Sequence, residues 1–219
     1  MTSIEADLRH WSKTVLEIPN KHLKGLPACP YAKAAWAQNK VKVIEHEDIY
    51  AGVLTATENF WKHDFDLIIV ASFKIPPFEE FDTWLTGVND AFTAQDLHLM
   101  GFHPEYGAED ADLDFLYTHE WESEIEDEYC MVFVQSLSQV DDASLLLEKK
   151  GYYDAFHQFE YEDLVLKRRE RRNGNETSGN EKEASSQKRH DARRHGEEED
   201  RDDARWHGSE EKEEVAVSI

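Results

Sequence analysis

One apolar segment near the middle of the chain constrains the fold more than any other feature. Residues 65–73, FDLIIVASF, are almost continuously apolar and rich in β-branched side chains, which is typical of a strand covered on both faces. Such a strand needs a packed layer on each side of its sheet. We therefore expect residues 65–73 to form the central strand of an α/β sheet.

Further strands and amphipathic helices alternate around this segment. The other predicted strands are residues 41–46, 97–103 and 129–136. The predicted helices are residues 2–18, 48–61, 78–92, 137–150 and 152–166. Asp48 is the expected N-cap of the second helix, and Gly151 is the expected stop of the fourth. Strands linked by such helices imply right-handed crossovers. The sequence thus predicts a single α/β domain, residues 1–166, with a small, mainly parallel four-stranded sheet and flanking helices.

Acidic side chains are concentrated in this predicted domain. Residues 1–166 hold 32 Asp and Glu against 11 Lys and Arg, which accounts for −21 of the total formal charge of −23. Eleven of these acidic groups lie in an acidic loop at residues 104–128, which is expected to be either functional or disordered. A surface this negative repels phosphate backbones and anionic lipid. We expect neither nucleic acid nor a membrane to bind the domain, and a cationic protein or a metal ion is the expected partner.

The last part of the chain has a different composition. Residues 167–219 mix both charges and hold few apolar side chains, so we expect a disordered charged tail. Its first residues could act as a nuclear localisation signal or nucleic-acid handle, or could simply be solvated; they are Lys167, Arg168, Arg169, Arg171 and Arg172. No signal peptide, membrane-spanning run or disulfide framework is recognisable, which predicts a cytoplasmic location.

Cys29 and His103 are the candidate catalytic residues. Pro30 favours a helix start, where unpaired N–H groups would lower the pKa of the Cys29 thiol and make it a thiolate nucleophile. The alternative is a buried cysteine that packs a helix onto the sheet. His103 follows a predicted strand, where it could be a base, an acid or a metal ligand, or could cap the strand through hydrogen bonds to the loop.

A divalent metal is a further candidate, and the cofactor is otherwise unknown. The acidic loop contains His119, Glu120 and Glu122, which together with His103 could bind zinc, manganese or iron. A solvated acidic loop without metal is the alternative. The motifs of P-loop proteins, dinucleotide-binding domains, zinc peptidases and α/β-hydrolases are absent from the sequence.

Two spaced motifs resemble a known family. Cys29-Pro30-Tyr31-Ala32 and Phe102-His103-Pro104-Glu105-Tyr106 are similar to the Cys-Pro-Phe-Ala and Phe-His-Pro-Asp-Tyr motifs of the bacterial domain of unknown function 1415 family. The resemblance covers about residues 5–107. The arginine-containing segments that follow in the family are absent here, and the acidic loop stands in their place. The resemblance implies a pairing of Cys29 with His103, and it implies no particular reaction.

These residues support three functional hypotheses, and they leave open whether the protein is an enzyme. The first is a small enzyme or redox protein with Cys29 and His103 in one pocket, which requires the sulfur and the ring to lie within about 8 Å of each other. The other residues of that pocket would be Pro30, Tyr31, Phe102, Pro104, Glu105 and Tyr106. The second is a non-catalytic interaction protein that presents the acidic loop to a cationic partner. The third is a module that binds a divalent metal.

Overall fold

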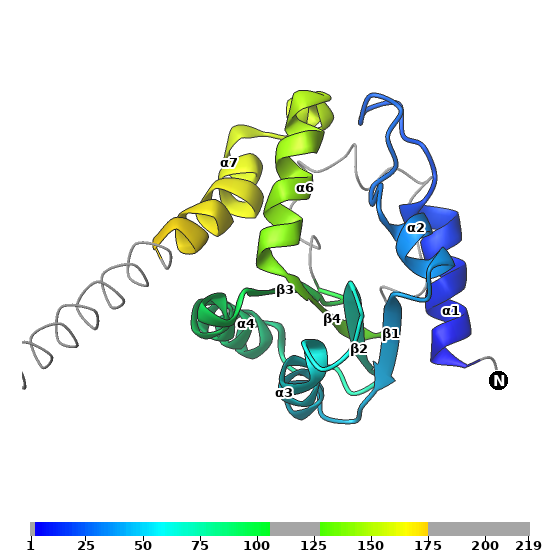
Figure 1. The fold of residues 1–219 in the computed structure, drawn as a ribbon. Coiled ribbons are helices and arrows are strands. Elements are labelled where there is room, and N and C mark those ends of the chain that lie inside the picture. The colour runs from blue at the N-terminus through cyan, green and yellow to red at the C-terminus, as the bar shows by residue number, and fades with distance from the viewer. Residues whose placement is uncertain (1–2, 106–127, 175–219) are drawn as a thin grey trace, which may run out of the picture. The chain divides into compact units, whose positions relative to one another are not determined.

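The computed structural model describes residues 3–105 and 128–174. In this part of the chain, four strands form one sheet in the order β1-β2-β4-β3 (Figure 1). The strands are β1 (Val41–Glu45), β2 (Leu67–Ser72), β3 (Leu97–Phe102) and β4 (Cys130–Ser136). Helices flank the sheet, so the predicted α/β domain with four strands is confirmed.

The sheet is mixed in direction and not mainly parallel as expected, because two of its three strand pairings are antiparallel. β1 and β2 are parallel, whereas β4 is antiparallel to both of its neighbours, β2 and β3. Three of the four strands therefore point the same way, and β4 lies between two of them in the opposite direction. β2 is a central strand, as expected for residues 65–73, and its residues from Ile68 to Ser72 are all buried.

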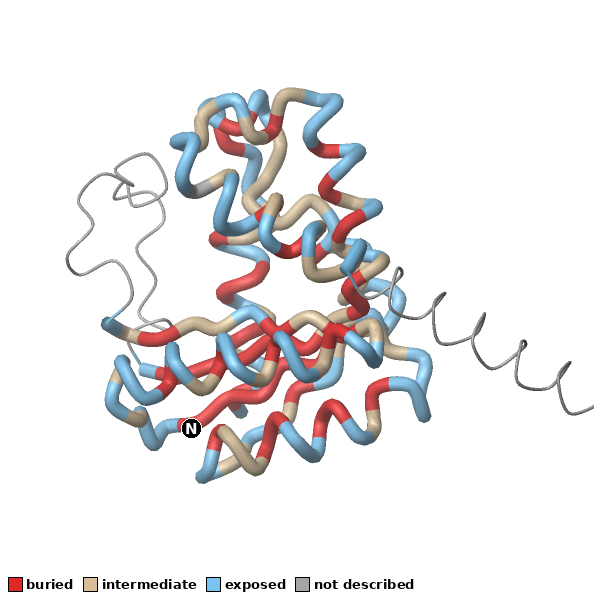
Figure 2. Tube along the Cα trace, turned by 90° about the vertical axis from the view of Figure 1, so that its left-hand side faces the viewer, coloured by how far each residue is buried: buried red, intermediate tan, exposed pale blue. Residues whose placement is uncertain are grey.

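Helices α3 (Ile49–Phe60) and α4 (Phe78–Phe92) cover one face of the sheet (Figure 1). Asp48 is the N-cap of α3, as expected, and its carboxylate accepts hydrogen bonds from the N–H groups of Tyr50 and Ala51. Figure 2 shows buried residues along the strands and along the inward sides of these helices. The fully buried side chains of this layer include Val53, Phe60 and Phe81, which pack onto Val70 and Val132 of the central strands.

Two contacts hold α4 against the edge strand β3. Gly101 lies so close to α4 that an added Cβ would meet Leu85 at 2.6 Å and Phe81 at 2.8 Å, so the close approach requires glycine here. The buried Asn89 amide donates to the Leu99 carbonyl at 2.8 Å and accepts from the Leu99 N–H at 2.8 Å. This side chain satisfies the outward backbone groups of an edge strand, which would otherwise be unpaired.

Helices α1 (Ile4–Trp11) and α2 (Ala32–Ala37) lie on the opposite face. α1 continues to Leu16 with the wider spacing of a π-helix. Its buried Trp11 makes edge-to-face contacts with Phe102 and Phe133, at centroid distances of 5.9 and 6.3 Å. The two faces of the sheet therefore carry separate apolar clusters, as two covered faces require.

The chain leaves the sheet after β4. Helix α6 (Leu137–Lys149) follows, and it ends at Gly151, whose φ of 74° confirms the predicted stop. After a short 3-10 turn, Tyr152–Ala155, the chain forms α7 (Gln158–Tyr161), which continues without a break as helix to residue 173. We name residues 158–173 the C-terminal helix.

The C-terminal helix passes the predicted domain boundary at residue 166. Residues 167–173 are helical, Arg168 is only 8% exposed, and the compact unit ends at Asn173. Residues 106–127 of the acidic loop and residues 175–219 of the tail lie outside the described residues. No helix in the described part of the chain has the length and apolar character that crossing a membrane requires.

Candidate functional site

Cys29 lies in the turn that precedes α2, two residues before its N-cap and so near the helix start, as predicted. The helix begins at Ala32 with Tyr31 as the N-cap residue, two residues later than Pro30 suggests. The Cys29 N–H donates to the Leu16 carbonyl at 2.9 Å. The preceding carbonyl, that of Ala28, accepts a hydrogen bond of 2.6 Å from the Tyr152 hydroxyl. Cys29 is therefore half-buried between the end of the first helix and the turn after α6.

The environment of Cys29 disfavours a thiolate. Burial raises the pKa of its thiol above the ordinary value, and the negative charge of Glu17 acts in the same direction. The backbone N–H groups of Tyr31 and Ala32 lower the pKa, as helix-start geometry predicts, but burial is the larger effect. Burial thus outweighs the lowering of the thiol pKa that a helix start was expected to give, and the protonated thiol is the form favoured at neutral pH.

His103 is buried, and both of its ring nitrogens bond to backbone. Nε2 lies 2.8 Å from the Pro76 carbonyl oxygen, and Nδ1 accepts the Glu105 N–H at 3.1 Å. With Nδ1 as the acceptor from Glu105, Nε2 is the ring nitrogen that donates to the Pro76 carbonyl. The rings of Phe78 and Phe81 contact the imidazole at centroid distances of 5.4 and 5.5 Å. This arrangement is the strand-capping alternative that the sequence left open.

Cys29 and His103 lie at opposite ends of the sheet. His103 follows the carboxyl end of β3, while Cys29 lies with Tyr152 beyond the other end, where β4 leads into α6 (Figure 1). The five residue steps of β3 alone span about 16 Å. The structure therefore does not bring the two side chains within the roughly 8 Å that a shared pocket requires.

The remaining residues predicted around that pocket are also separated. Pro30 and Tyr31 accompany Cys29, whereas Pro104 and Glu105 accompany His103. Phe102 points to the other face of the sheet, against Trp11. The predicted residues Tyr106, His119, Glu120 and Glu122 lie outside the described residues. Within residues 3–105 and 128–174, no three His, Cys, Asp or Glu side chains gather closely enough to hold a metal ion.

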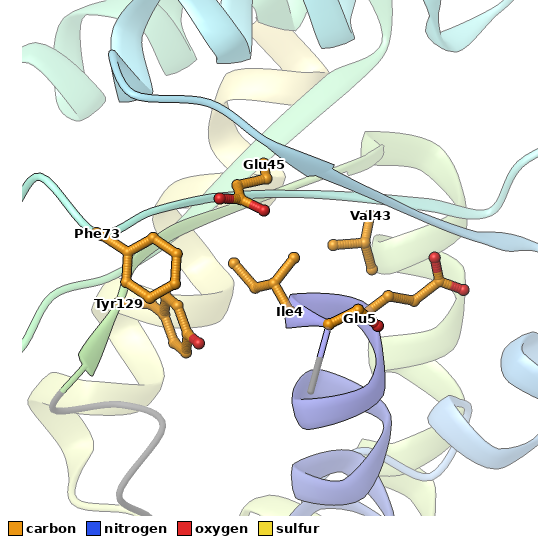
Figure 3. Close-up of a pocket in the computed structure, with 7 residues that line it drawn as sticks. Ile4, Glu5, Val43, Glu45, Phe73 and Tyr129 are labelled. Atoms are coloured by element: carbon orange, nitrogen blue, oxygen red, sulfur yellow. The ribbon is translucent and has the colours of Figure 1, made fainter. Parts of the chain in front are cut away.

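A different site is formed at the carboxyl edge of β1 and β2. A cavity of about 440 Å³ lies between the start of α1, the ends of these two strands and the first residues before β4 (Figure 3). Its lining residues are Ser3, Ile4, Glu5, Val43, Glu45, Phe73 and Tyr129. We name this cavity the edge pocket.

Two aromatic rings and two carboxylates line the edge pocket. The rings of Phe73 and Tyr129 lie together at one side, with centroids 4.6 Å apart, while Glu5 and Glu45 come from α1 and β1 (Figure 3). Phe73 is 58% exposed, so its ring is accessible to a ligand. The carboxylate of Glu45 lies on the side of the rings, whereas that of Glu5 points away from them (Figure 3). The pocket thus offers apolar ring surface and the negative charge of Glu45 to the same ligand.

The field at the edge pocket is negative. The pKa of the Tyr129 hydroxyl is raised, first by burial and then by the negative charges of Asp7, Glu128 and Glu45. Lys74, which follows Phe73 in the chain, pairs with Glu47 at 2.6 Å and does not line the pocket. Among the described residues no Lys or Arg lines the pocket, so a cation that enters it meets a negative field.

Sequence reasoning missed the edge pocket because its residues come from four separate segments. Sites in α/β sheets usually lie outside the carboxyl ends of parallel strands. This rule could have found Glu45, the last residue of β1, and Phe73, the first residue after β2. A comparison of the chain with protein-family models, with curated proteins and with solved structures finds no match.

Proposed function

We propose that this protein is a non-catalytic interaction protein that binds a cationic partner, with the edge pocket as the point of recognition. The observation that carries the proposal is the combination of Glu45 with the rings of Phe73 and Tyr129 around one cavity. The net charge of −21 over residues 1–166 supports it, since long-range attraction would steer a cationic protein toward the domain.

A lysine or arginine side chain fits this chemistry. Its aliphatic stem can lie on an aromatic ring while its charged end reaches a carboxylate. Cation–π contacts of this kind contribute about 0.5–2 kcal/mol, depending on how far the cation is desolvated. The acidic loop would add to the attraction, because its last residue, Glu128, directly precedes Tyr129.

The other two hypotheses receive less support. An enzyme with a Cys29 and His103 pocket has no support in the geometry, because the two residues lie apart and the thiol is protonated. A metal-binding module depends on His119, Glu120 and Glu122, which lie outside the described residues, so it stays a prediction. The resemblance to the bacterial domain of unknown function 1415 family also stays a prediction.

The test is binding of fluorescein-labelled octalysine, followed by fluorescence anisotropy at about 20 mM and about 300 mM NaCl. We expect salt-sensitive binding to the wild-type protein. Phe73→Ala should weaken it about threefold or more through the lost ring contact. Glu45→Gln should weaken it and reduce its salt dependence.

Two control variants make the same chemical changes elsewhere. Glu58→Gln removes an exposed carboxylate from α3, on the other face of the sheet, and Phe159→Ala removes a ring that is 59% exposed in the C-terminal helix. Phe159→Ala should leave the affinity for octalysine unchanged. Glu58→Gln should weaken it only slightly, because the domain loses one negative charge far from the pocket. Equal losses in the control and pocket variants would show that binding is non-specific and would overturn the proposal.

A further inference from the structure

Four of the five cations in the basic run at the start of the predicted tail pair with acidic side chains of α4 and α6. The fifth, Lys167, pairs within its own helix, with Asp163. The other partners are Asp90 on α4 and Asp141, Asp142 and Glu148 on α6. We name these four residues the acidic surface.

One buried pair anchors the C-terminal helix. Arg168 Nε donates to Asp141 Oδ1 at 2.7 Å, and the two side chains are 10% and 2% exposed. Arg172, one turn further along, lies 3.8 Å from the second oxygen of Asp141 and 3.4 Å from Asp142. A charged group this deeply buried is stable only with its partner, so Asp141 selects a cation at this position.

The neighbouring pairs extend the recognition along both helices. Arg169 Nη2 donates to Glu148 at 2.9 Å and to the Ser144 hydroxyl at 3.0 Å. Arg171 Nε lies 3.4 Å from Asp90. The partners on α6 run from Glu148 back to Asp142 as the C-terminal helix runs forward, so the two helices are antiparallel. Arg168, Arg169 and Arg172 thus match carboxylates at two places on α6 that lie about two helical turns apart.

The C-terminal helix buries few apolar side chains against the domain. Of its described side chains only Val165 and Arg168 are buried, while Phe159 and Leu164 are 59% and 49% exposed. Within the buried network, Arg168 Nη2 and Arg169 Nε make no hydrogen bond in the described part of the chain. Salt weakens the more exposed pairs of this helix, Arg171 with Asp90 and Arg172 with Asp142, whereas the buried pair of Arg168 with Asp141 is screened much less.

We propose that the acidic surface is a binding site for arginine-rich helices, and that the C-terminal helix is its resident, exchangeable ligand. The ligand pattern is that of residues 168–172, with arginines at positions one, two, four and five of a helix. In the docked state, the basic run is not available as a localisation signal or nucleic-acid handle. A helix of the same chemistry from another protein competes for the acidic surface when the resident helix separates.

The experiment uses the full chain and a fluorescein-labelled peptide with the sequence of residues 158–173. The variant Arg168→Gln with Arg172→Gln weakens the resident helix and leaves the acidic surface intact. We expect this double variant to bind the peptide at least tenfold more tightly than the wild-type protein, in which the resident helix competes. Adding Asp141→Asn should abolish the gain, because the anchor carboxylate is lost.

Two further variants of the double variant serve as controls. Asp64→Asn removes a carboxylate that is 93% exposed and pairs with Lys40, so the gain should persist. Phe73→Ala damages the edge pocket and should also leave the gain intact, which separates this inference from the proposed function. Circular dichroism verifies the fold, and Arg172→Gln alone, at a side chain that is 29% exposed, provides a milder variant.

Two results would overturn the inference. If neither the double variant nor Arg172→Gln binds the peptide more tightly than the wild-type protein, the C-terminal helix is a fixed structural element. If the gain survives Asp141→Asn, the peptide binds somewhere other than the acidic surface. A gain that requires Asp141 and is indifferent to Asp64 and Phe73 supports the inference.

Discussion

The bridge between Asn89 and the edge strand predicts a large effect from a small substitution. In Asn89→Ala, the N–H and carbonyl groups of Leu99 lose both of their side-chain partners at once. Each lost hydrogen bond costs about 1 kcal/mol, and each buried backbone group left unpaired costs about 1–3 kcal/mol. Some relief comes from water at the sheet edge, so we expect a loss of about 2–4 kcal/mol. This is a large part of the 5–15 kcal/mol that stabilises a typical domain.

The assay is urea unfolding, followed by circular dichroism and by tryptophan fluorescence. The expected result is a lower midpoint at an unchanged slope, because the substitution changes stability and not the surface exposed on unfolding. Asn59→Ala is the matched control: its amide donates to the Thr55 carbonyl at 2.7 Å, but on the exposed side of α3. It should cost less than about 0.5 kcal/mol. Equal losses in the two variants would refute the reasoning, because they would show that the edge-strand bridge contributes nothing specific.

Three further predictions test other parts of the structure. The thiol of Cys29 should be alkylated at pH 7.4 more slowly in the native than in the unfolded protein, because burial raises its pKa. Mass spectrometry distinguishes the alkylation of Cys29 from that of Cys130. An inflection below pH 8 in the plot of Cys29 alkylation rate against pH would contradict this prediction. Burial, followed by the charges of Arg168 and Arg171, lowers the pKa of His98 to about 3, so the folded state holds this ring neutral while the unfolded state protonates it below about pH 6.5. The contribution of His98 to the free energy of unfolding is therefore complete above pH 6.5 and falls as the pH drops toward 3. Between these pH values, His98→Gln should reduce the slope of the unfolding free energy against pH by up to about 1 kcal/mol per pH unit. An unchanged slope would contradict the prediction. Gly101→Ala should cost about 1–3 kcal/mol in urea unfolding, because its Cβ would overlap Leu85 and Phe81, and a neutral result would mean that α4 moves away freely.

Local patterns in the sequence determined the secondary structure well. The apolar run at 65–73 became the buried central strand β2, and Asp48 and Gly151 occupy the helix boundaries that their chemistry predicts. These features depend on neighbouring residues, since a carboxylate that caps a helix and a glycine with positive φ act within a few positions of themselves. The strand-capping alternative for His103 was also readable from its place after β3.

The candidate site depended on relations that local patterns do not contain. Cys29 and His103 each look like site residues in their own segments, but the sheet separates them by its full length. The edge pocket joins Glu5, Glu45 and Phe73 to Tyr129, which follows them by more than fifty residues. Distances of this kind depend on strand order and on how the helices pack.

The sequence by itself therefore determined the α/β class, the number of strands, the covered faces of the central strand and the acidity of the domain. The tertiary structure alone decided that β4 lies antiparallel between β2 and β3, and that the basic run at residues 167–172 docks on α6 and α4. The physical reason is the range of the interactions. Side-chain periodicity and caps act over a few residues, whereas strand order and buried ion pairs such as Asp141 with Arg168 join segments far apart in the chain.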